Sequence, residues 1–307
     1  SDLDAGTILS NLATSSGFAG FVSKFDSTGT YKYSLIIDST GTDDLRGINC
    51  DAFGSLYVTG QVPLNCDAVI KYSSTSNVNI GYLPALTTAY AYLAKFDNLG
   101  NFEPPINTTS DKYYIILDST TNTDEGLSIT CDSFGNMYFS GDYNGTPTIK
   151  DQNGTTLFTL PASSGIAAFV CKFDSNGNYQ YTRILDTAGS DLGNSVTCDS
   201  SGNMYFAGYF TGSPTIKNQA GTSLGTLPGS SSTAAFVCKF DSSGTYVYTR
   251  VVDAVNSDHG FSVACDSSGN MYFAGDYAGN TPYVKNEAGT ILFTLPTVTG
   301  QAVFVTK

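Results

Sequence analysis

One set of carboxylates recurs along the chain at a fixed distance from a repeated cysteine. Each aspartate lies seven residues before that cysteine, in a loop that leads into an apolar segment. The four are Asp43, Asp124, Asp191 and Asp258. Four carboxylates around one central channel could hold Ca²⁺ or another hard cation, because such ions prefer oxygen ligands. The alternative is that each aspartate accepts hydrogen bonds from backbone amides of its own or the next repeat. We expect no other cofactor.

Catalytic chemistry has little support in the residue types present. His259, within an Asp-His-Gly sequence, is the only histidine, and we interpret it as a surface turn residue. No GxSxG elbow, phosphate-binding loop or dinucleotide fingerprint occurs. Paired carboxylates could serve glycoside hydrolysis, but nearly all aspartates recur in every repeat, whereas catalytic groups should break the repeat. We therefore expect no enzyme, with a hydrolase that uses loop aspartates as the less favoured alternative.

Lysines also recur at equivalent places, inside otherwise apolar segments. They are Lys24, Lys95, Lys172 and Lys239. A lysine in such surroundings needs a carboxylate, so we expect each to pair with an aspartate at a strand end. The expected partners are Asp38, Asp118, Asp186 and Asp253.

Cysteines occupy a third repeated position. They are Cys50, Cys131, Cys198 and Cys265. We interpret them as small apolar fillers where neighbouring repeats meet. The chain has seven cysteines and no CxxC motif, and an odd number argues against a planned disulfide set. Unpaired cysteines favour an intracellular protein, or one assembled into a particle in a reducing compartment.

Tyrosines supply the candidate binding surface. A tyrosine offers a broad face and loses little entropy on binding, so it suits contact with sugars or with a partner protein. The candidates are Tyr72, Tyr82, Tyr143, Tyr209 and Tyr277. We expect another protein as partner, or self-association through terminal edge strands, with a glycan as the alternative.

Composition narrows the possibilities further. The 307 residues carry a net charge of −13, and a surface of that sign repels phosphate backbones, so we expect no nucleic acid partner. No apolar run of about 18 residues occurs, so no membrane-spanning segment is expected. Only three of the 27 acidic residues are glutamates, and 32 residues are glycine. That bias favours strands joined by tight turns.

Two sequence blocks recur in step with each other. Residues 169–183 (FVCKFDSNGNYQYTR) recur at 236–250 (FVCKFDSSGTYVYTR), and weaker copies begin at Phe21 and Tyr92. The block that begins at Cys198 (CDSSGNMYFAG) recurs at the other three cysteines named above, and the last three of the four are 67 residues apart. A fixed period of this length indicates a repeat architecture.

Each repeat divides into short strands and turns. Asp174 and Asp199 open turns that separate apolar segments, and a glycine three residues later supplies the positive φ that such turns need. Residues 214–228 are more polar and predict an extra, exposed hairpin. No helical period is present. We predict an all-β fold, a β-propeller of four tandem four-stranded blades of about 67 residues each.

The repeat resembles a known family. The runs AFVCKFDSSGTYVYTR and GFSVACDSSGNMYFAGDY are similar to the seven-bladed β-propeller (SBBP) repeat, over essentially residues 5–307. The family usually carries a tryptophan after the first turn, where this chain has Tyr33, Tyr181 and Tyr248 and no tryptophan at all. The resemblance implies a divergent propeller and says little about ligand or activity.

The two ends of the chain overlap in the repeat, because residues 5–24 correspond to residues 288–307. Three interpretations stay open: an added strand in a closed four-bladed ring, an exposed edge that pairs with another copy, or a piece of a longer array. We treat residues 1–307 as one propeller domain. Its units are 5–87, 88–164, 165–231 and 232–300, followed by a terminal strand, 301–307. The expected function is a scaffold or protein-interaction module, which includes a structural component of a larger particle.

Overall fold

The computed structural model describes residues 15, 17–73, 77–101, 114–119 and 123–307. These residues form antiparallel strands and no helix, so the prediction of an all-β fold is confirmed. In this part of the chain no helix is long and apolar enough to cross a membrane. Part of the N-terminal overlap, residues 5–14, lies outside the described residues.

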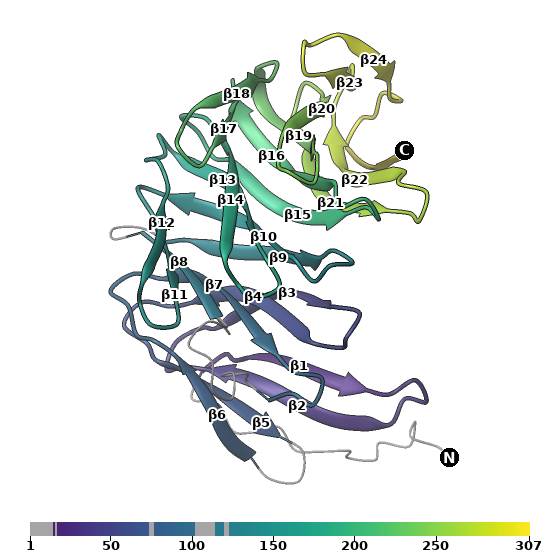
Figure 1. Ribbon diagram of the computed structural model, residues 1–307. Coiled ribbons are helices and arrows are strands. Elements are labelled where there is room, and N and C mark those ends of the chain that lie inside the picture. Colours follow the sequence, from purple (N-terminus) through teal and green to yellow (C-terminus); the bar gives the residue numbers. More distant parts are fainter. Residues whose placement is uncertain (1–14, 16, 74–76, 102–113, 120–122) are drawn as a thin grey trace.

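Five sheets, which we call blades, follow one another along the chain (Figure 1). The first blade contains β1 (Gly20–Phe25), β2 (Tyr31–Asp38), β5 (Ala68–Ser73) and β6 (Asn77–Leu83). The second blade contains β3 (Asp44–Cys50), β4 (Leu56–Val62), β7 (Tyr90–Phe96), β8 (Tyr114–Asp118), β11 (Thr148–Asp151) and β12 (Thr156–Thr159). The third blade contains β9 (Glu125–Cys131), β10 (Met137–Asn144), β13 (Ile166–Phe173), β14 (Tyr179–Asp186), β17 (Thr215–Asn218) and β18 (Ser223–Thr226).

The fourth blade contains β15 (Leu192–Cys198), β16 (Met204–Gly212), β19 (Ser230–Phe240), β20 (Tyr246–Asp253), β23 (Tyr283–Asn286) and β24 (Ile291–Thr294). The fifth blade contains β21 (His259–Cys265), β22 (Met271–Ala278) and β25 (Gln301–Thr306). A complete blade therefore has six strands, in three hairpins that we call inner, middle and outer. In the fourth blade these are β15–β16, β19–β20 and β23–β24.

The chain does not finish one blade before it starts the next. After the inner hairpin of the fourth blade, the chain returns to the third blade, where β17 pairs with β14, and only then forms the middle hairpin of the fourth. Each repeat unit of the sequence is thus spread over two blades. The predicted extra hairpin exists, and it provides the two outermost strands of a six-stranded blade.

The blades form an open arc, with the first and the fifth blade at its opposite ends (Figure 1). The innermost strands of neighbouring blades pack against one another along this arc: β3 against β9, β9 against β15, and β15 against β21. This arrangement around a common axis is that of a propeller. Closure at four blades is not confirmed.

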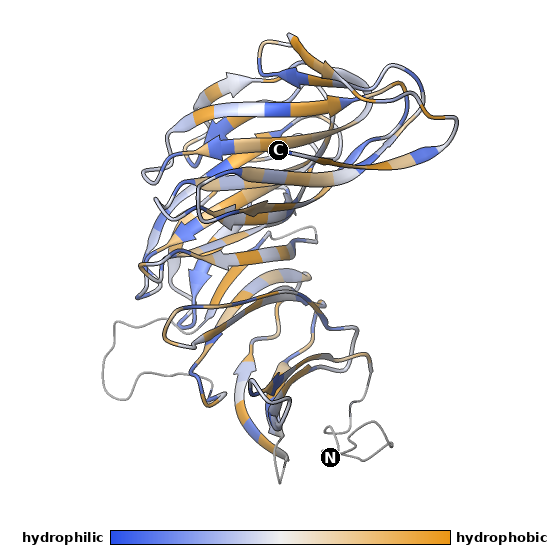
Figure 2. Cartoon of the chain, turned by 90° about the vertical axis from the view of Figure 1, so that its right-hand side faces the viewer, coloured by the Kyte–Doolittle hydropathy of each residue, from blue (hydrophilic) through white to orange (hydrophobic). Residues whose placement is uncertain are grey.

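The core lies between the blades. Four apolar clusters each fill the space between two successive blades, and apolar segments occur on strands of every blade in Figure 2. A strand such as β16 is buried at six of its nine positions because both faces of its sheet are covered. Its Phe206 packs edge-on against Phe236 of β19, with ring centroids 5.3 Å apart.

Aspartate and glycine make the hairpin turns. The Asp199 Oδ1 atom accepts hydrogen bonds from the amides of Ser201 and Asn203, at 2.9 and 3.0 Å. Gly202 donates to the carbonyl of Asp199 and has a φ of +75°, which glycine adopts without strain. The same arrangement recurs at Asp26, Asp51, Asp97, Asp132, Asp151, Asp174, Asp241 and Asp266, and Asn218 and Asn286 take the place of the aspartate in two outer hairpins. The predicted turn chemistry is confirmed at these turns.

Candidate functional site

The four repeated aspartates are buried at the entry to the innermost strands. Asp191 is typical. Its Oδ2 atom accepts a hydrogen bond from the Thr187 amide at 2.7 Å, and its Oδ1 atom accepts one from the Thr211 amide at 3.3 Å. The carboxylate thus joins the incoming loop to the second strand of the inner hairpin. Asp124 and Asp258 make the corresponding pairs of bonds, and Asp43 binds the amide of Ser39.

These contacts correspond to the second of the two roles considered from the sequence, hydrogen bonding to backbone amides. Among the described residues, no group of three or more His, Cys, Asp or Glu side chains could hold a metal ion. The structure therefore does not gather the four aspartates into such a group, and the cation stays a prediction. Burial raises the pKa of Asp124 and Asp191 to about 7 and that of Asp258 to about 6.

The repeated lysines have other partners than the ones predicted. Lys172 lies over the ring of Tyr138, with its Nζ atom 5.1 Å from the ring centroid, and donates to the carbonyl of Ser242 at 2.9 Å. The other three also lie over tyrosine rings, at 5.0 to 5.7 Å; they are Lys24, Lys95 and Lys239. Cation–π contact replaces the expected ion pair.

The predicted aspartate partners instead pair with lysines of the outer hairpins. The Lys217 Nζ atom lies 2.5 Å from Asp186 Oδ2, across β17 and β14. Equivalent pairs join Lys71 to Asp38, Lys150 to Asp118 and Lys285 to Asp253. The ion pair between strands exists, but it joins the middle hairpin to the outer one.

All seven cysteines are free. Cys131, Cys198 and Cys265 are partly buried and pack against the apolar clusters between blades, as expected. Cys50, at the equivalent place in β3, is exposed. The first blade has no inner hairpin among the described residues, so one side of this region is uncovered.

Two of the five candidate binding tyrosines are core residues. Tyr143 and Tyr277 are 1% and 4% exposed, and their hydroxyls donate to the carbonyls of Pro161 and Pro296. Neither ring can meet a sugar or a partner, so the prediction of exposed binding residues is wrong for these two. Tyr82 is 58% exposed. Tyr72 is partly buried against Tyr33, and Tyr209 is partly buried against His259.

A different set of residues breaks the repeat symmetry at one end of the inner hairpins. In the second to fifth blades, the residue after the repeated aspartate faces the residue after a repeated glycine on the neighbouring strand. We call these the variable pairs. They are Asp44–Gln61, Glu125–Asp142, Leu192–Tyr209 and His259–Asp276.

In the fourth variable pair, both carboxylate oxygens of Asp276 have a hydrogen-bond partner. His259 Nδ1 lies 2.8 Å from Asp276 Oδ1, and Gln301 Nε2 donates to Asp276 Oδ2 at 2.6 Å. The imidazole is 4.9 Å from the ring of Tyr209 and stacks on Phe261 at 5.8 Å. His259 is thus a partly buried strand residue with defined partners, and its interpretation as a surface turn residue is wrong.

The second variable pair places two carboxyl groups opposite each other. Asp142 is 7% exposed, and its buried Oδ2 atom has no hydrogen-bond partner among the described residues. Burial raises the pKa of Asp142 well above its usual range, and the charges of Glu125 and Asp124 add to the effect. Arg46 lies 3.4 Å from the Glu125 carboxylate and opposes that shift.

The second, third and fourth pairs are neighbours along the arc. Burial raises the pKa of Tyr209, and the charges of Asp142 and Glu125 raise it further, while the same ring touches His259. The result is a row of unit-specific polar side chains across three blades. The sequence carried a signal for it, because these positions differ between otherwise matching repeats.

No family model matches the chain. A similar curated protein is an uncharacterized WD repeat-containing protein, L264, of Acanthamoeba polyphaga mimivirus. It is 26% identical over 193 residues, which cover 57% of this chain and 14% of that protein. The chain therefore matches about one seventh of that relative's length. WD repeats form propellers, in agreement with the fold, whereas membership of the SBBP family is not confirmed.

Among solved structures, one similar chain is a protein of unknown function from Bacteroides caccae. It is 14% identical, the alignment covers 66% of this chain and 68% of that one, and the TM-score is 0.22. This TM-score is too low to support a structural comparison.

Proposed function

We propose that this chain is a non-enzymatic β-propeller scaffold that binds another protein, and that the partner places a basic side chain at Glu125 and Asp142. The observation that carries this proposal is the buried Oδ2 atom of Asp142, to which no group in the described part of the chain donates a hydrogen bond. A buried polar atom without a partner is costly, and like charges directly opposite on neighbouring strands add to that cost. Such an arrangement suits a site that is completed by a ligand.

The fourth variable pair indicates what is missing in the second. At the position of His259 the third blade has Glu125, and at the position of Gln301 it has Ile166. Asp276 therefore receives two donors that Asp142 lacks. A guanidinium group would supply both, since it donates two parallel hydrogen bonds to a carboxylate.

Other features support a protein as the ligand. The partly exposed ring of Tyr209 lies beside the pair and offers a face for an arginine or an aromatic side chain. The net charge of −13 favours encounter with basic partners. The similarity to a WD repeat-containing protein is in line with a scaffold.

The test uses a minimal probe with a neutral control. The peptide acetyl-Gly-Arg-Gly-amide, and the same peptide with citrulline in place of arginine, are titrated into ¹⁵N-labelled protein at physiological salt. We expect saturable shifts in the amides of β9 and β10 with the arginine peptide only. Asp142→Asn should weaken binding at least fivefold. Asp276→Asn is the matched control, because it alters net charge equally at a carboxylate whose donors are already present.

Two results would count against the proposal. Equal shifts with the citrulline peptide would show that no cation is recognised. Equal weakening by Asp276→Asn would show that only the overall charge of the protein matters.

A further inference from the structure

Arg46 lies at a β-bulge of β3, beside the third blade. The β3–β4 register shifts between Leu45 and Gly47, which leaves Arg46 without a paired residue. A bulge of this kind re-aims a side chain. The backbone next to it packs closely on β9, since a Cβ added at Gly47 would lie 3.0 Å from the Cα atom of Ser128. The fold therefore places Arg46 next to Glu125, the first residue of β9.

A polar contact from the bulge to the next blade recurs elsewhere in the chain. The β15–β16 register shifts between Leu192 and Ser195. Asn194, inside this shift, donates from Nδ2 to the carbonyl of Gly260 on β21 at 2.7 Å. The corresponding bulge residue of β9 is Leu127, which has no polar group to offer. The contact made by Arg46 is therefore specific to its own blade.

Two carboxylates lie close to the Arg46 guanidinium. Its Nη2 atom donates to Asp44 Oδ2 at 2.9 Å and lies 3.4 Å from Glu125 Oε2. Only the shorter distance falls in the usual range for an N–H···O hydrogen bond. Glu125 faces Asp142 across the β9–β10 register, and the charge of Arg46 acts against the rise in the pKa of Asp142. Arg46 is thus bonded to Asp44 while it stands beside the second variable pair.

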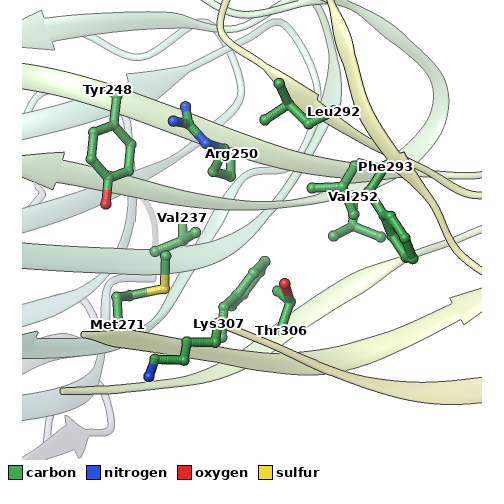
Figure 3. A pocket seen from close by; sticks show the side chains of 11 residues that line it. Val237, Tyr248, Arg250, Val252, Met271, Leu292, Phe293, Thr306 and Lys307 are labelled. Carbon is green, nitrogen blue, oxygen red and sulfur yellow. The ribbon is translucent and has the colours of Figure 1, made fainter. Parts of the chain in front are cut away.

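Arg250 shows how much more firmly the chain holds an arginine elsewhere. Figure 3 shows it beside Tyr248 on β20, and its guanidinium lies 4.4 Å from the ring centroid. Its Nη1 atom also lies 3.2 Å from the carboxylate of Glu287. For Arg46 the described residues provide one hydrogen bond, from Asp44, and no ring contact. The position of the Arg46 guanidinium therefore depends on Asp44.

A released Arg46 would compete for the site at Glu125 and Asp142. A guanidinium group can donate two parallel hydrogen bonds to a carboxylate, and no described group donates to Asp142 Oδ2. A group on the same chain competes at a high effective concentration. Whether the site is open to a partner is therefore decided by what holds Arg46.

We propose that Asp44 is a positioning residue, which holds Arg46 away from Asp142 and so keeps the site open for the arginine of a partner protein. The inference rests on the proposed function for the identity of that ligand. Without the Asp44 carboxylate, Arg46 turns to Glu125 and Asp142 and takes the place of the partner's guanidinium. Asp44 thus favours binding without touching the partner.

The first test is a double-mutant cycle with the peptide acetyl-Gly-Arg-Gly-amide at physiological salt. Asp44→Asn should weaken binding about fivefold or more, and Asp44→Glu, which keeps a carboxylate for Arg46, should restore most of the affinity. Arg46→Met is the matched background, because it has no guanidinium to release. There Asp44→Asn should change the dissociation constant less than about twofold. Equal weakening in both backgrounds would show that Asp44 acts only through its charge, and would overturn the proposal.

The second test needs no peptide. Carboxyl ¹³C shifts report the pKa of Asp142 in the free protein. Asp44→Asn should lower this pKa, because Arg46 moves onto the Asp142 carboxylate and favours its charged form. In the Arg46→Met background the same substitution should leave the pKa of Asp142 nearly unchanged.

The two readouts separate this inference from the proposed function. A peptide that fails to bind the unaltered protein, together with the expected change in the pKa of Asp142, would contradict the proposed function and support the positioning role. A pKa of Asp142 that Asp44→Asn leaves unchanged, or lowers equally in the Arg46→Met background, would overturn the positioning role whatever the peptide does.

Discussion

The Nδ1 atom of His259 lies 2.8 Å from the Oδ1 atom of Asp276, whereas Asp142, at the same place two blades earlier, faces Glu125. One fold position therefore holds an aspartate in two opposite environments. The surrounding strands, turn and glycine are the same, so the pair is an internal comparison of a matched buried carboxylate with an unmatched one.

This comparison predicts stability changes of opposite sign. Asp276→Asn leaves either His259 or Gln301 without a carboxylate oxygen and should lower the free energy of unfolding by about 1–2 kcal/mol. Asp142→Asn removes a carboxylate whose charge is opposed by burial and by Glu125, and should raise it by about 1 kcal/mol or more at pH 7. Urea unfolding of both variants at pH 7 measures the two effects.

Acid provides the control for Asp142→Asn. Because the folded protein raises the pKa of Asp142, its carboxylate costs stability only above the pKa of the unfolded chain, 3.8. At about pH 3.5 the group is largely protonated in both states, so the gain should disappear. A gain that persists there would mean that the charge of Asp142 is not its cause.

The repeated aspartates predict how stability depends on pH. The pKa of Asp124 and Asp191 is about 7, that of Asp258 is about 6, and the unfolded value is 3.8. Between these limits the folded state holds protons that the unfolded state has released, so stability falls as pH rises. Each group contributes about 1.4 kcal/mol per pH unit inside its window. The free energy of unfolding should decrease from pH 5 to pH 7 and level off above.

Urea unfolding across this range measures the slope, and carboxyl ¹³C shifts assign the groups. Turn aspartates act oppositely: hydrogen bonds from Asn270, together with the neighbouring amides, hold the pKa of Asp266 below its usual value. Their contribution is lost only as pH falls through the range below 3.8. A free energy that rises from pH 5 to pH 7 would contradict the assignment of the raised pKa values to the buried set.

A lysine of an outer hairpin should contribute more to the free energy of unfolding than a surface lysine does. Lys217 pairs with Asp186, whose side chain is 4% exposed, so Lys217→Met leaves a buried carboxylate without its cation. We expect a loss of about 2 kcal/mol. Lys32 pairs with Asp26 in solvent, with exposed fractions of 45% and 33%, so Lys32→Met should cost clearly less than Lys217→Met, because solvent screens the pair. Equal losses of unfolding free energy in the two variants would show that burial does not strengthen the ion pair between Lys217 and Asp186.

The sequence predicts the parts of this fold that depend on local chemistry. The turn at Asp199 needs only an aspartate side chain and the glycine three residues later, and both are visible in the repeat. The partner of Asp186 is a different matter. It lies on β17, which returns to the third blade after the fourth has begun, and no local pattern records that return. The sequence alone therefore points to Lys172, in the neighbouring apolar segment, as the cation for Asp186.

Residue type alone also does not predict which side chains of the candidate site are buried. Tyr143 and Tyr277 follow polar residues in β10 and β22, but neighbouring blades cover β10 on both faces, and Tyr277 of β22 packs into the apolar cluster shared with the fourth blade. A tyrosine there is core. His259 and Asp142 occupy positions at which the repeats differ. The propeller is identified from the positions that the repeats share, so that evidence does not single out these two residues.

The glycine before Asp142 determines how closely the two strands of this site can approach. A Cβ at Gly141 would lie 1.8 Å from the carbonyl oxygen of Glu125, at the point where the β9–β10 register shifts. Gly141→Ala must therefore push β9 away from β10, and we expect a loss of 3 kcal/mol or more, at the upper end for single substitutions. Gly300→Ala is the matched control, because a Cβ there meets nothing within 4 Å and should change stability by less than about 0.5 kcal/mol. Urea unfolding compares the two. A tolerated Gly141→Ala would mean that the strands can separate at little cost, so the opposed carboxyl groups of Glu125 and Asp142 would not be held together by the backbone.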